Sequence, residues 1–386
     1  MGAEEPTRIL HWGMNDNLGG IETFVMNLYR HIDRDKVQFD FLCDYDCKHI
    51  AFEEEILSMG GRIFRVMVPQ RESMLKSRKA LLSFFDEHSE IQGVHVHANF
   101  PYALPLKYAR KCGIQLRLLH SHNAASGDDS RTEDTVHKLI RYARGLQSTY
   151  QINRYPSDYA ACSQAAAEFM FPGKSFTWIR NGIDTERFAY NATVRREMRL
   201  RLGIAESTTV IGFCGRFREQ KNPLFTLKVF AEYHKLVPDS KLLMIGVGEL
   251  QHKVDVLIHE LGIDDVVCLA GAQKDVSPFY QAMDAFLLPS LFEGLGIVYI
   301  EAQCAGLPCL ASARVVPSEA QASGLLRYVS LDTSASYWAK ELDRSIIDAG
   351  ERHDYSAIVR AAGYDIHDVA EQMQHIYLNK AGRSKR

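Results

Sequence analysis

The sequence predicts an α/β protein in which two doubly wound parallel sheets follow one another along the chain. Short apolar runs alternate with longer segments of helical spacing, which is the pattern of strand–helix–strand units. The alternation restarts after Asp184, and 386 residues exceed what one compact core usually organises. We therefore expect two domains, over residues 1–187 and 188–364, and a C-terminal helix within about 365–386.

The first expected domain begins with an apolar strand, a glycine-rich loop and a helix. Phe24, Val25 and Leu28 follow helical spacing, and Gly60-Gly61 can end the next helix in a left-handed turn. The expected strands are Arg8–Trp12, Phe39–Cys43, Ile63–Val66, Val94–His97 and Leu116–His120. The expected helices lie near Glu22–His31, Glu53–Met59, Lys76–Glu87 and Ala103–Cys112.

The second expected domain repeats this alternation. Its strands are Val210–Gly215, Lys241–Ile245, Val266–Leu269, Ala285–Leu288 and Cys309–Ala311. Its helices are Pro223–Leu236, His252–Leu261, Val276–Met283 and Ile297–Ala305, and the chain closes with a helix at Asp368–Leu378. Gly306 and Pro308 mark a typical helix end. Two such Rossmann-like domains would face a central cleft, with ligands outside the carboxyl ends of the strands.

Composition excludes several classes of protein. A net charge of −3 provides no global attraction to nucleic acid. The eight cysteines contain no C-x-x-C pair, so we expect reduced thiols and no zinc site. The first residues carry no apolar signal segment and no run approaches the length of a membrane span. We therefore expect a cytoplasmic protein.

The strongest motif runs from Leu288 to Glu301, where an apolar strand enters a glycine-rich turn that opens a helix. Such a turn binds phosphate through backbone N–H groups and the helix dipole. Glu301 lies eight positions after Glu293, so it can accept ribose hydroxyls while Glu293 reaches a sugar. Either glutamate alone is compatible with a structural role, but the combination favours function. The turn supplies Gly294, Leu295, Gly296 and Ile297.

A second motif, Gly215 to Pro223, connects a strand to a helix and carries Arg216 and Lys221. A diphosphate leaving group needs positive charge, and without a metal arginine and lysine must supply it. The structural alternative is a solvated loop in which Arg218 pairs with Glu219.

Two weaker signals lie in the first domain. Gly19 and Gly20 can bring backbone amides close to a ligand, although a helix-start loop explains them equally well. Histidines cluster at two strand ends, and we expect either His120 or His122 to touch substrate, with His122 preferred. The alternatives are core packing and a metal site, which lacks a carboxylate or cysteine partner. The cluster comprises His95, His97, His120 and His122.

Three further patterns are considered and given less weight. Asp44-Tyr-Asp46 is a D-x-D sequence that we do not interpret as a metal site. Gly246-Val-Gly248 lacks the third glycine of a dinucleotide fingerprint, but fits a strand-end loop near a diphosphate. A basic face suits either solvent or anionic lipid. Its residues are Arg78, Lys79, Lys107, Arg110, Lys111, Lys138, Arg141, Tyr142 and Arg144.

The sequence resembles family 4 retaining glycosyltransferases of the GT-B fold over nearly its whole length. The resemblance rests on the glutamate pair, the two cations, Asn181-Gly-Ile-Asp184 and Gly19-Gly20. The Gly-Gly-Ile-Glu-Thr and His-Ser-His-Asn segments are most similar to bacterial enzymes that build capsular or extracellular polysaccharides. The sequence departs from the family at Leu295, where phenylalanine is usual.

The resemblance implies catalytic roles for Glu293, His122, Arg216 and Lys221. It also implies a donor site formed by Gly19, Gly20, Arg216, Lys221, Gly271, Ala272, Lys274, Glu293, Gly294, Leu295, Gly296, Ile297 and Glu301. The residues around Gly271 and Lys274 would meet the base, and the last helix would pack on the first domain.

The implied reaction moves a hexose or N-acetylhexosamine from a nucleotide-sugar donor, a UDP-sugar by expectation, to an acceptor hydroxyl, with retention and with no metal or other cofactor. The acceptor would be a saccharide or lipid-linked saccharide, met through loops Gln70–Ser77 and Ala124–Thr135, with peripheral contact at the inner membrane face. The alternatives are a sugar-nucleotide epimerase, a pyridoxal-dependent phosphorylase, for which no lysine stands out, and a non-catalytic nucleotide-sugar sensor.

Overall fold

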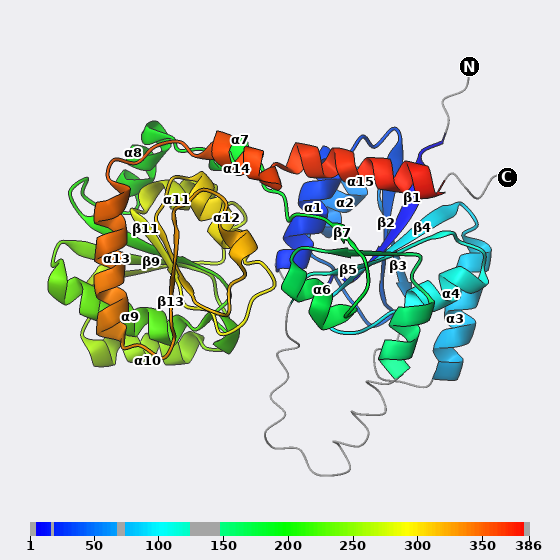
Figure 1. Cartoon of the computed structure of the whole chain (residues 1–386), viewed down its shortest axis with the longest axis horizontal. Coiled ribbons are helices and arrows are strands. Elements are labelled where there is room, and N and C mark those ends of the chain that lie inside the picture. Colours follow the sequence, from blue (N-terminus) through cyan, green and yellow to red (C-terminus); the bar gives the residue numbers. More distant parts are fainter. Residues whose placement is uncertain (1–4, 17–18, 68–73, 124–146, 382–386) are drawn as a thin grey trace, which may run out of the picture. The chain divides into compact units, whose positions relative to one another are not determined.

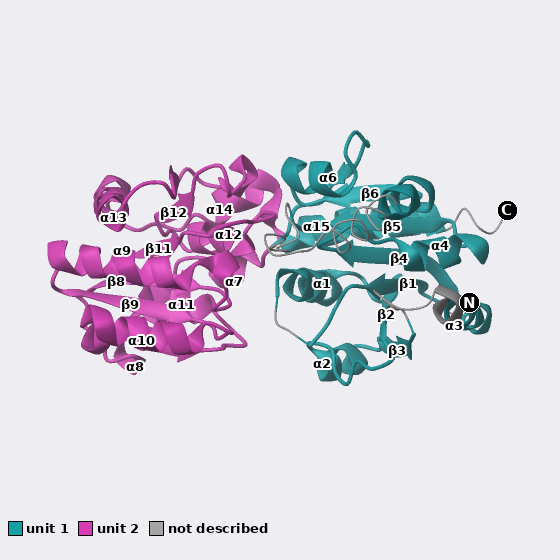
Figure 2. Cartoon of the chain, turned by 90° about the horizontal axis from the view of Figure 1, so that it is seen from below, with its two compact units in different colours: residues 1–182, 366–386 teal, residues 183–365 magenta. Residues whose placement is uncertain are grey.

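The computed structural model describes residues 5–16, 19–67, 74–123 and 147–381. The chain divides into two compact units, coloured separately in Figure 2. Unit 1 comprises residues 1–182 and 366–386, and unit 2 comprises residues 183–365. The C-terminal helix therefore belongs to unit 1, together with the first half of the chain.

Unit 1 contains a seven-stranded sheet in the order β3-β2-β1-β4-β5-β6-β7, in which every pairing is parallel. The strands are β1 (Thr7–Trp12), β2 (Val37–Asp44), β3 (Arg62–Val66), β4 (Ile91–Ala98), β5 (Leu116–Ser121), β6 (Asp158–Ala161) and β7 (Thr177–Trp178). The five expected strands are confirmed. The sequence analysis missed β6 and β7 because runs of four and two residues carry too little alternation.

Helices cover this sheet and bury its apolar faces. They are α1 (Gly20–His31), α2 (Glu53–Ser58), α3 (Met74–Glu87), α4 (Leu104–Lys111), α6 (Gln164–Met170) and α15 (Ile366–Ala381). Phe24, Val25 and Leu28 on α1 are fully buried, as their spacing predicted. Helix α15 lies beside α1 and buries Met373 and Tyr377 in the same core (Figure 1).

Unit 2 contains a six-stranded sheet in the order β10-β9-β8-β11-β12-β13, also parallel throughout. The strands are β8 (Thr209–Cys214), β9 (Ser240–Ile245), β10 (Val267–Gly271), β11 (Ala285–Leu288), β12 (Cys309–Ser312) and β13 (Leu326–Val329). The five expected strands are confirmed, and β13 is added. The strand order reverses between β8 and β11, which are neighbours although β9 and β10 separate them in the sequence.

The helices of unit 2 are α7 (Thr185–Phe188), α8 (Ala192–Arg201), α9 (Pro223–Leu236), α10 (Gln251–Leu261), α11 (Ser277–Ala282), α12 (Ile297–Cys304), α13 (Ala335–Ala349) and α14 (Ser356–Val359). The sequence analysis did not predict α13, although two signals were present. Trp338, Leu342 and Ser345 have helical spacing and are buried, and Ser334 caps the first turn by accepting a hydrogen bond from the Tyr337 N–H.

Candidate active site

The switch in strand order places two loops of unit 2 side by side. Strand β8 leads into residues 215–222, which carry the predicted cations, and β11 leads into residues 289–296, which carry the glycines. The strands pair in parallel, with Ala285 opposite Ile211, so both loops leave the same edge of the sheet. This is the position at which open α/β sheets bind ligands.

Hydrogen bonds join these two loops directly. The Leu291 N–H donates to the Gln220 carbonyl at 2.8 Å, and the Gln220 side chain donates to the Phe292 carbonyl at 3.2 Å. The Asn222 amide donates to the Pro289 carbonyl at 3.1 Å. Asn222 has a φ of 53°, a left-handed conformation that asparagine tolerates better than most residues. The two motifs that the sequence separates by about 70 positions are therefore one structure.

Lys221 and Glu293 form the charged centre of this structure. The Lys221 ammonium lies 2.5 Å from Oε1 of Glu293, and the Ser290 hydroxyl donates to the same oxygen at 2.8 Å. Glu293 is 5% exposed, so its charge is held by a lysine and a hydroxyl rather than by water. Arg216 is exposed, and the structure shows no ion pair for it among the described residues.

The glycine-rich turn has the conformation that its sequence requires. Gly296 precedes α12 with a φ of 78°, and a Cβ there would lie 2.6 Å from the Tyr299 ring. Only glycine fits both constraints. Gly294 and Leu295 are buried, and Ile297 opens the helix at its N-terminus, the end of a helix that generally attracts an anion.

Glu301 lies one turn inside α12 and is buried. The Tyr280 hydroxyl, from α11, donates to Oε2 of Glu301 at 2.9 Å. Burial raises the pKa of Glu301 to about 7, and the Tyr280 hydrogen bond opposes part of this rise. A carboxylate so placed has one hydroxyl partner from the protein and can accept more from a ligand.

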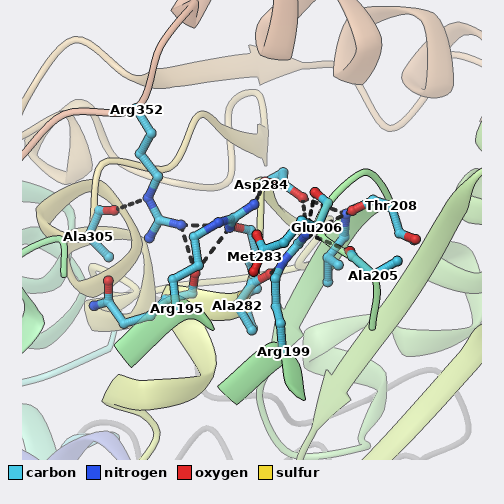
Figure 3. Close-up of polar contacts among 12 residues, drawn as sticks. Arg195, Arg199, Ala205, Glu206, Thr208, Ala282, Met283, Asp284, Ala305 and Arg352 are labelled. Carbon is cyan, nitrogen blue, oxygen red and sulfur yellow. Dashed lines mark hydrogen bonds and ion pairs between the residues drawn. The ribbon is translucent and has the colours of Figure 1, made fainter. Parts of the chain in front are cut away.

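Three arginines that the sequence analysis missed hold α11 in place (Figure 3). Arg195 and Arg352 both donate to the carbonyls of Gln281 and Met283. Arg352 also donates to Tyr280 O, and Arg199 donates to Ala282 O. These bonds satisfy the carbonyls that a helix end leaves unpaired. Burial lowers the pKa of Arg352 to about 9.

The Asp284 carboxylate forms ion pairs with two of these arginines. Asp284 accepts from Arg195 at 2.6 Å and from Arg199 at 2.7 Å. The spacing of Arg195 and Arg199, one turn apart on α8, was the signal in the sequence. The arginines fix the end of α11, and with it the helix that carries Tyr280.

The predicted base-contact residues follow the outer strand β10. Gly271 has a φ of 69°, while Ala272 and Lys274 are exposed. The Gly271 carbonyl accepts from the Gly246 N–H at 2.8 Å. A Cβ on Gly246 would lie 2.1 Å from the Gly215 carbonyl oxygen. The ends of β8, β9 and β10 are thus stacked closely, and Gly246 is explained by this close backbone approach.

In unit 1, Gly19 and Gly20 lie at the start of α1. Gly19 is the residue before the helix and has no side chain to cap it. A Cβ there would lie 2.7 Å from Oε2 of Glu22, whereas a Cβ on Gly20 would meet open space. Glu22 is buried and accepts from both amides of Asn15, at 3.2 and 2.8 Å. Burial raises the pKa of Glu22. The sequence analysis did not select this residue as a site candidate.

All four predicted histidines lie on one face of the sheet and are buried, together with His11 of β1. The cluster forms two rows of hydrogen bonds. In the first, His97 bonds to His11 at 3.0 Å and to His122 at 2.9 Å. In the second, His95 bonds to the Tyr377 hydroxyl at 2.7 Å and to His120 at 3.2 Å.

The histidines also form two overlapping groups with ring nitrogens close enough to share an ion. They are His11, His95 and His97, and His97, His120 and His122. Hydrogen bonds already engage most of these nitrogens, and neither group contains a carboxylate or thiolate. Burial lowers the pKa of His11 and of His122 to about 3, so both rings are neutral. Of the D-x-D pair, Asp44 accepts from the Tyr45 N–H at 2.8 Å.

Comparison with known proteins identifies the family. The model described as Glycosyltransferase Family 4 matches residues 18–187, and the model described as Glycosyl transferases group 1 matches residues 194–361. EpsF of Bacillus subtilis, a protein named as a glycosyltransferase, is 31% identical over 376 residues, 96% of each chain. The chain belongs to the family 4 glycosyltransferases. It is therefore a transferase enzyme, and its two parallel sheets form the GT-B fold.

Other relatives of this glycosyltransferase differ in the sugar donors that their names give. An Escherichia coli enzyme named as a UDP-Gal:alpha-D-GlcNAc-diphosphoundecaprenol alpha-1,3-galactosyltransferase is 26% identical over 79% of each chain. A GDP-mannose-dependent mannosyltransferase of Mycolicibacterium smegmatis is 27% identical over 67% of this chain and 68% of its own. The crystal structure of Anabaena HepE with UDP and glucose superposes with a TM-score of 0.74 and 17% identity, over 96% of this chain and 99% of that chain. At that identity the likeness shows the fold.

The predicted basic face is described in part. Lys107 of α4 places its ammonium over the Tyr108 and Tyr155 rings, at 5.6 and 5.9 Å from their centroids. Arg110 donates to the Arg154 carbonyl at 2.7 Å. Lys138, Arg141, Tyr142 and Arg144 lie outside the described residues, as do the loop Ala124–Thr135 and residues 70–73 of the expected loop Gln70–Ser77, whose remaining residues belong to the start of α3. No helix in the described part of the chain is both long and apolar enough to cross a bilayer.

Proposed function

We propose that this glycosyltransferase moves a hexose or N-acetylhexosamine from a UDP-sugar to a hydroxyl of a saccharide or lipid-linked saccharide acceptor, with retention and without a metal. The observation that carries the proposal is the joined pair of loops at the β8–β11 switch, centred on Lys221 and Glu293. It combines positive charge, a glycine-rich helix start and a buried carboxylate in one structure. The Escherichia coli relative, whose name gives a diphosphoundecaprenol-linked acceptor, supports a lipid-linked acceptor here, and we infer bacterial surface polysaccharide synthesis as the process.

Each part of the donor would contact a different part of the paired loops. Its diphosphate would accept hydrogen bonds from Arg216, Lys221 and the first turn of α12, and its ribose would donate to Glu301. A diphosphate that attracts Lys221 weakens the ion pair with Glu293. Glu293 is then free to accept from hydroxyls of the donor sugar. The loop at Gly271–Lys274 would meet the base.

The transfer step needs no protein nucleophile in this proposal. The bond between the anomeric carbon and the diphosphate oxygen breaks, and its electrons go to the diphosphate. The acceptor oxygen bonds to the same face of the anomeric carbon, and its proton passes to the departing phosphate oxygen. Arg216 and Lys221 stabilise the charge that develops on the diphosphate. An inverted anomeric centre in the product, read by NMR, would exclude this front-face mechanism.

A binding experiment and a transfer assay test the proposed donor site separately. UDP, GDP and several UDP-sugars would be titrated by calorimetry with and without EDTA, followed by transfer assays on Glu293→Ala. We expect UDP binding that EDTA does not change, near-normal UDP affinity in Glu293→Ala, and turnover lowered by about a hundredfold or more. Glu249→Ala is the matched control, because Glu249 is an exposed carboxylate on the neighbouring loop, 58% accessible. Preference for GDP, or loss of binding on chelation, would contradict the donor assignment.

A basic, aromatic surface around Lys107 and Tyr155 supports membrane contact as part of this function. Anionic headgroups attract lysine and arginine near a membrane surface, and tyrosine suits the interface. We expect the enzyme to co-sediment with vesicles containing phosphatidylglycerol and to release them at high salt. Equal sedimentation with neutral vesicles would exclude an electrostatic contact.

A further inference from the structure

The row formed by His11, His97 and His122 crosses three adjacent strands of unit 1, β1, β4 and β5. It runs inward from the carboxyl end of β5, where His122 follows the strand, to β1. The His11 and His97 rings are stacked on one another, with centroids 5.3 Å apart, which restricts the orientation of both rings. Residues of α1 and α15 close the face above the cluster, so the described structure places these rings in an apolar environment.

Two nitrogens at the ends of this row lack partners among the described residues. They are Nε2 of His11, inside the sheet, and Nδ1 of His122, at the strand end. A buried polar nitrogen without a partner costs free energy unless a ligand supplies one. The end at His122 lies at the carboxyl edge of the sheet, where open α/β sheets bind ligands. Nδ1 of His122 is therefore the member of the row that a ligand would meet.

The row couples the proton positions of its three rings. A neutral imidazole has one N–H and one accepting nitrogen. In both contacts Nδ1 of one ring faces Nε2 of the next. All three rings must then carry the proton on Nδ1, or all three on Nε2. The second state leaves a buried N–H of His11 without an acceptor, and buried donors without acceptors are rare in proteins. The first state leaves the N–H on Nδ1 of His122, which is also buried and without a partner among the described residues, but lies at the carboxyl edge of the sheet, where a ligand can accept from it.

We propose that His97, supported by His11, is a positioning residue that holds His122 as the Nδ1–H tautomer, ready to donate to a hydroxyl oxygen of a saccharide substrate. The inference rests on the proposed function and on the expectation from the sequence that His122 touches substrate. The rings around the row keep it rigid, since His122 also lies 5.3 Å from the Phe24 ring and 4.0 Å from the His120 ring, centroid to centroid. The backbone adds a constraint, because a Cβ on Gly13 would lie 2.2 Å from the His97 carbonyl oxygen.

Two amide substitutions separate the contacts of His97. His97→Asn places a polar atom near the position of Nδ1, so it can keep the bond to His122. His97→Gln reaches the position of Nε2, so it keeps the bond to His11 and loses the one to His122. We expect kcat to fall by about tenfold or more in His97→Gln and to be largely retained in His97→Asn, with the donor KM changed little in either.

His95→Leu is the matched control. His95 is equally buried on the same face but belongs to the second row, with the Tyr377 hydroxyl and His120. We expect it to lower thermal stability while leaving kcat close to the wild-type value. Equal losses of kcat in His97→Gln and His95→Leu would mean that both act through packing, and would overturn the proposal.

The tautomer itself can be read by long-range proton–nitrogen NMR on ¹⁵N-histidine-labelled full-length protein. We expect His122 to be the Nδ1–H form in the wild type and a mixture in His97→Gln. An Nε2–H form in the wild type, or an unchanged spectrum in the variant, would refute the inference. His122→Phe separates it from the proposed function: normal turnover there removes His122 from the site. Slow turnover in His122→Phe with normal turnover in His97→Gln rejects only the role of His97.

Discussion

At the residue scale, the donor half of the site depends on carboxylates that burial has changed. Glu293 is held by a lysine and a serine, whereas Glu301 has only the Tyr280 hydroxyl against the cost of burial. Burial accordingly raises the pKa of Glu301 to about 7. The two glutamates of one motif thus differ in their partners, because Glu293 has an ion pair and Glu301 has none among the described residues.

The raised pKa of Glu301 predicts a pH dependence of stability. The pKa of Glu301 in the folded protein, about 7, exceeds its ordinary value of 4.5. Between these values the folded state binds more protons than the unfolded state, so the free energy of unfolding falls as pH rises. Glu301→Gln removes this fall, and we expect it to gain stability relative to the wild type as pH is raised from about 5 to about 8. Urea denaturation at several pH values measures the free energy of unfolding of both proteins. If this free energy depended on pH in the same way for the two proteins, the prediction would be contradicted.

Ligand binding should respond in the opposite direction. Ribose hydroxyls donate to ionised Glu301, so UDP binding should release protons at neutral pH and weaken by about tenfold per unit below about pH 7. Calorimetry in two buffers of different ionisation enthalpy counts the protons. The Glu301→Gln variant should bind more weakly and release none. Proton release that persists in the variant would assign it to another group.

At the scale of elements, short helices at the site depend on side chains from distant parts of unit 2. Helix α11 has six residues, and its terminal carbonyls are bonded by Arg195, Arg199 and Arg352 (Figure 3). These arginines come from α8 and from the segment after α13. Such a helix is too short to persist alone, so the arginines determine where Tyr280 meets Glu301.

Removing one of these arginines should destabilise unit 2. Arg352→Leu leaves the carbonyls of Tyr280 and Ala305 without their arginine donor, and we expect a loss of about 2–4 kcal/mol in the free energy of unfolding. Arg344→Leu is the control, since Arg344 is 69% exposed and we expect a change within about 0.5 kcal/mol. Urea denaturation followed by fluorescence of Trp338, which is buried in unit 2, provides the measurement. Equal effects in the two variants would show that the carbonyl bonds contribute little.

At the scale of the whole molecule, unit 1 is completed by the last helix of the chain. Helix α15 contributes Met373 and Tyr377 to the core around α1 and β2. The Tyr377 hydroxyl also ends the second histidine row at His95. The sheet of unit 1 is thus covered by residues from both ends of the sequence.

This arrangement predicts a change confined to one unit. Met373→Ala removes a fully buried side chain and should cost about 2–5 kcal/mol. Hydrogen exchange followed by mass spectrometry should show faster exchange in β1, β2 and α1, while the strands of unit 2 keep their protection. Glu371→Ala, on the exposed side of α15, is the control. Faster exchange in unit 2 alone would place the helix in the other core.

The sequence by itself determined the alternation of strands and helices and the glycine-rich turn with Gly294 and Gly296, because these depend on local periodicity and backbone conformation. It also predicted site roles for Arg216, Lys221, Glu293, Glu301 and His122 from residue type and spacing. Only the tertiary structure decided which residues meet. The 2.5 Å contact of Lys221 with Glu293, the capping of α11 by three arginines, and the row from His11 to His122 join positions far apart in the chain. These contacts depend on the order of the strands in the two sheets, and the local periodicity of the sequence does not specify that order.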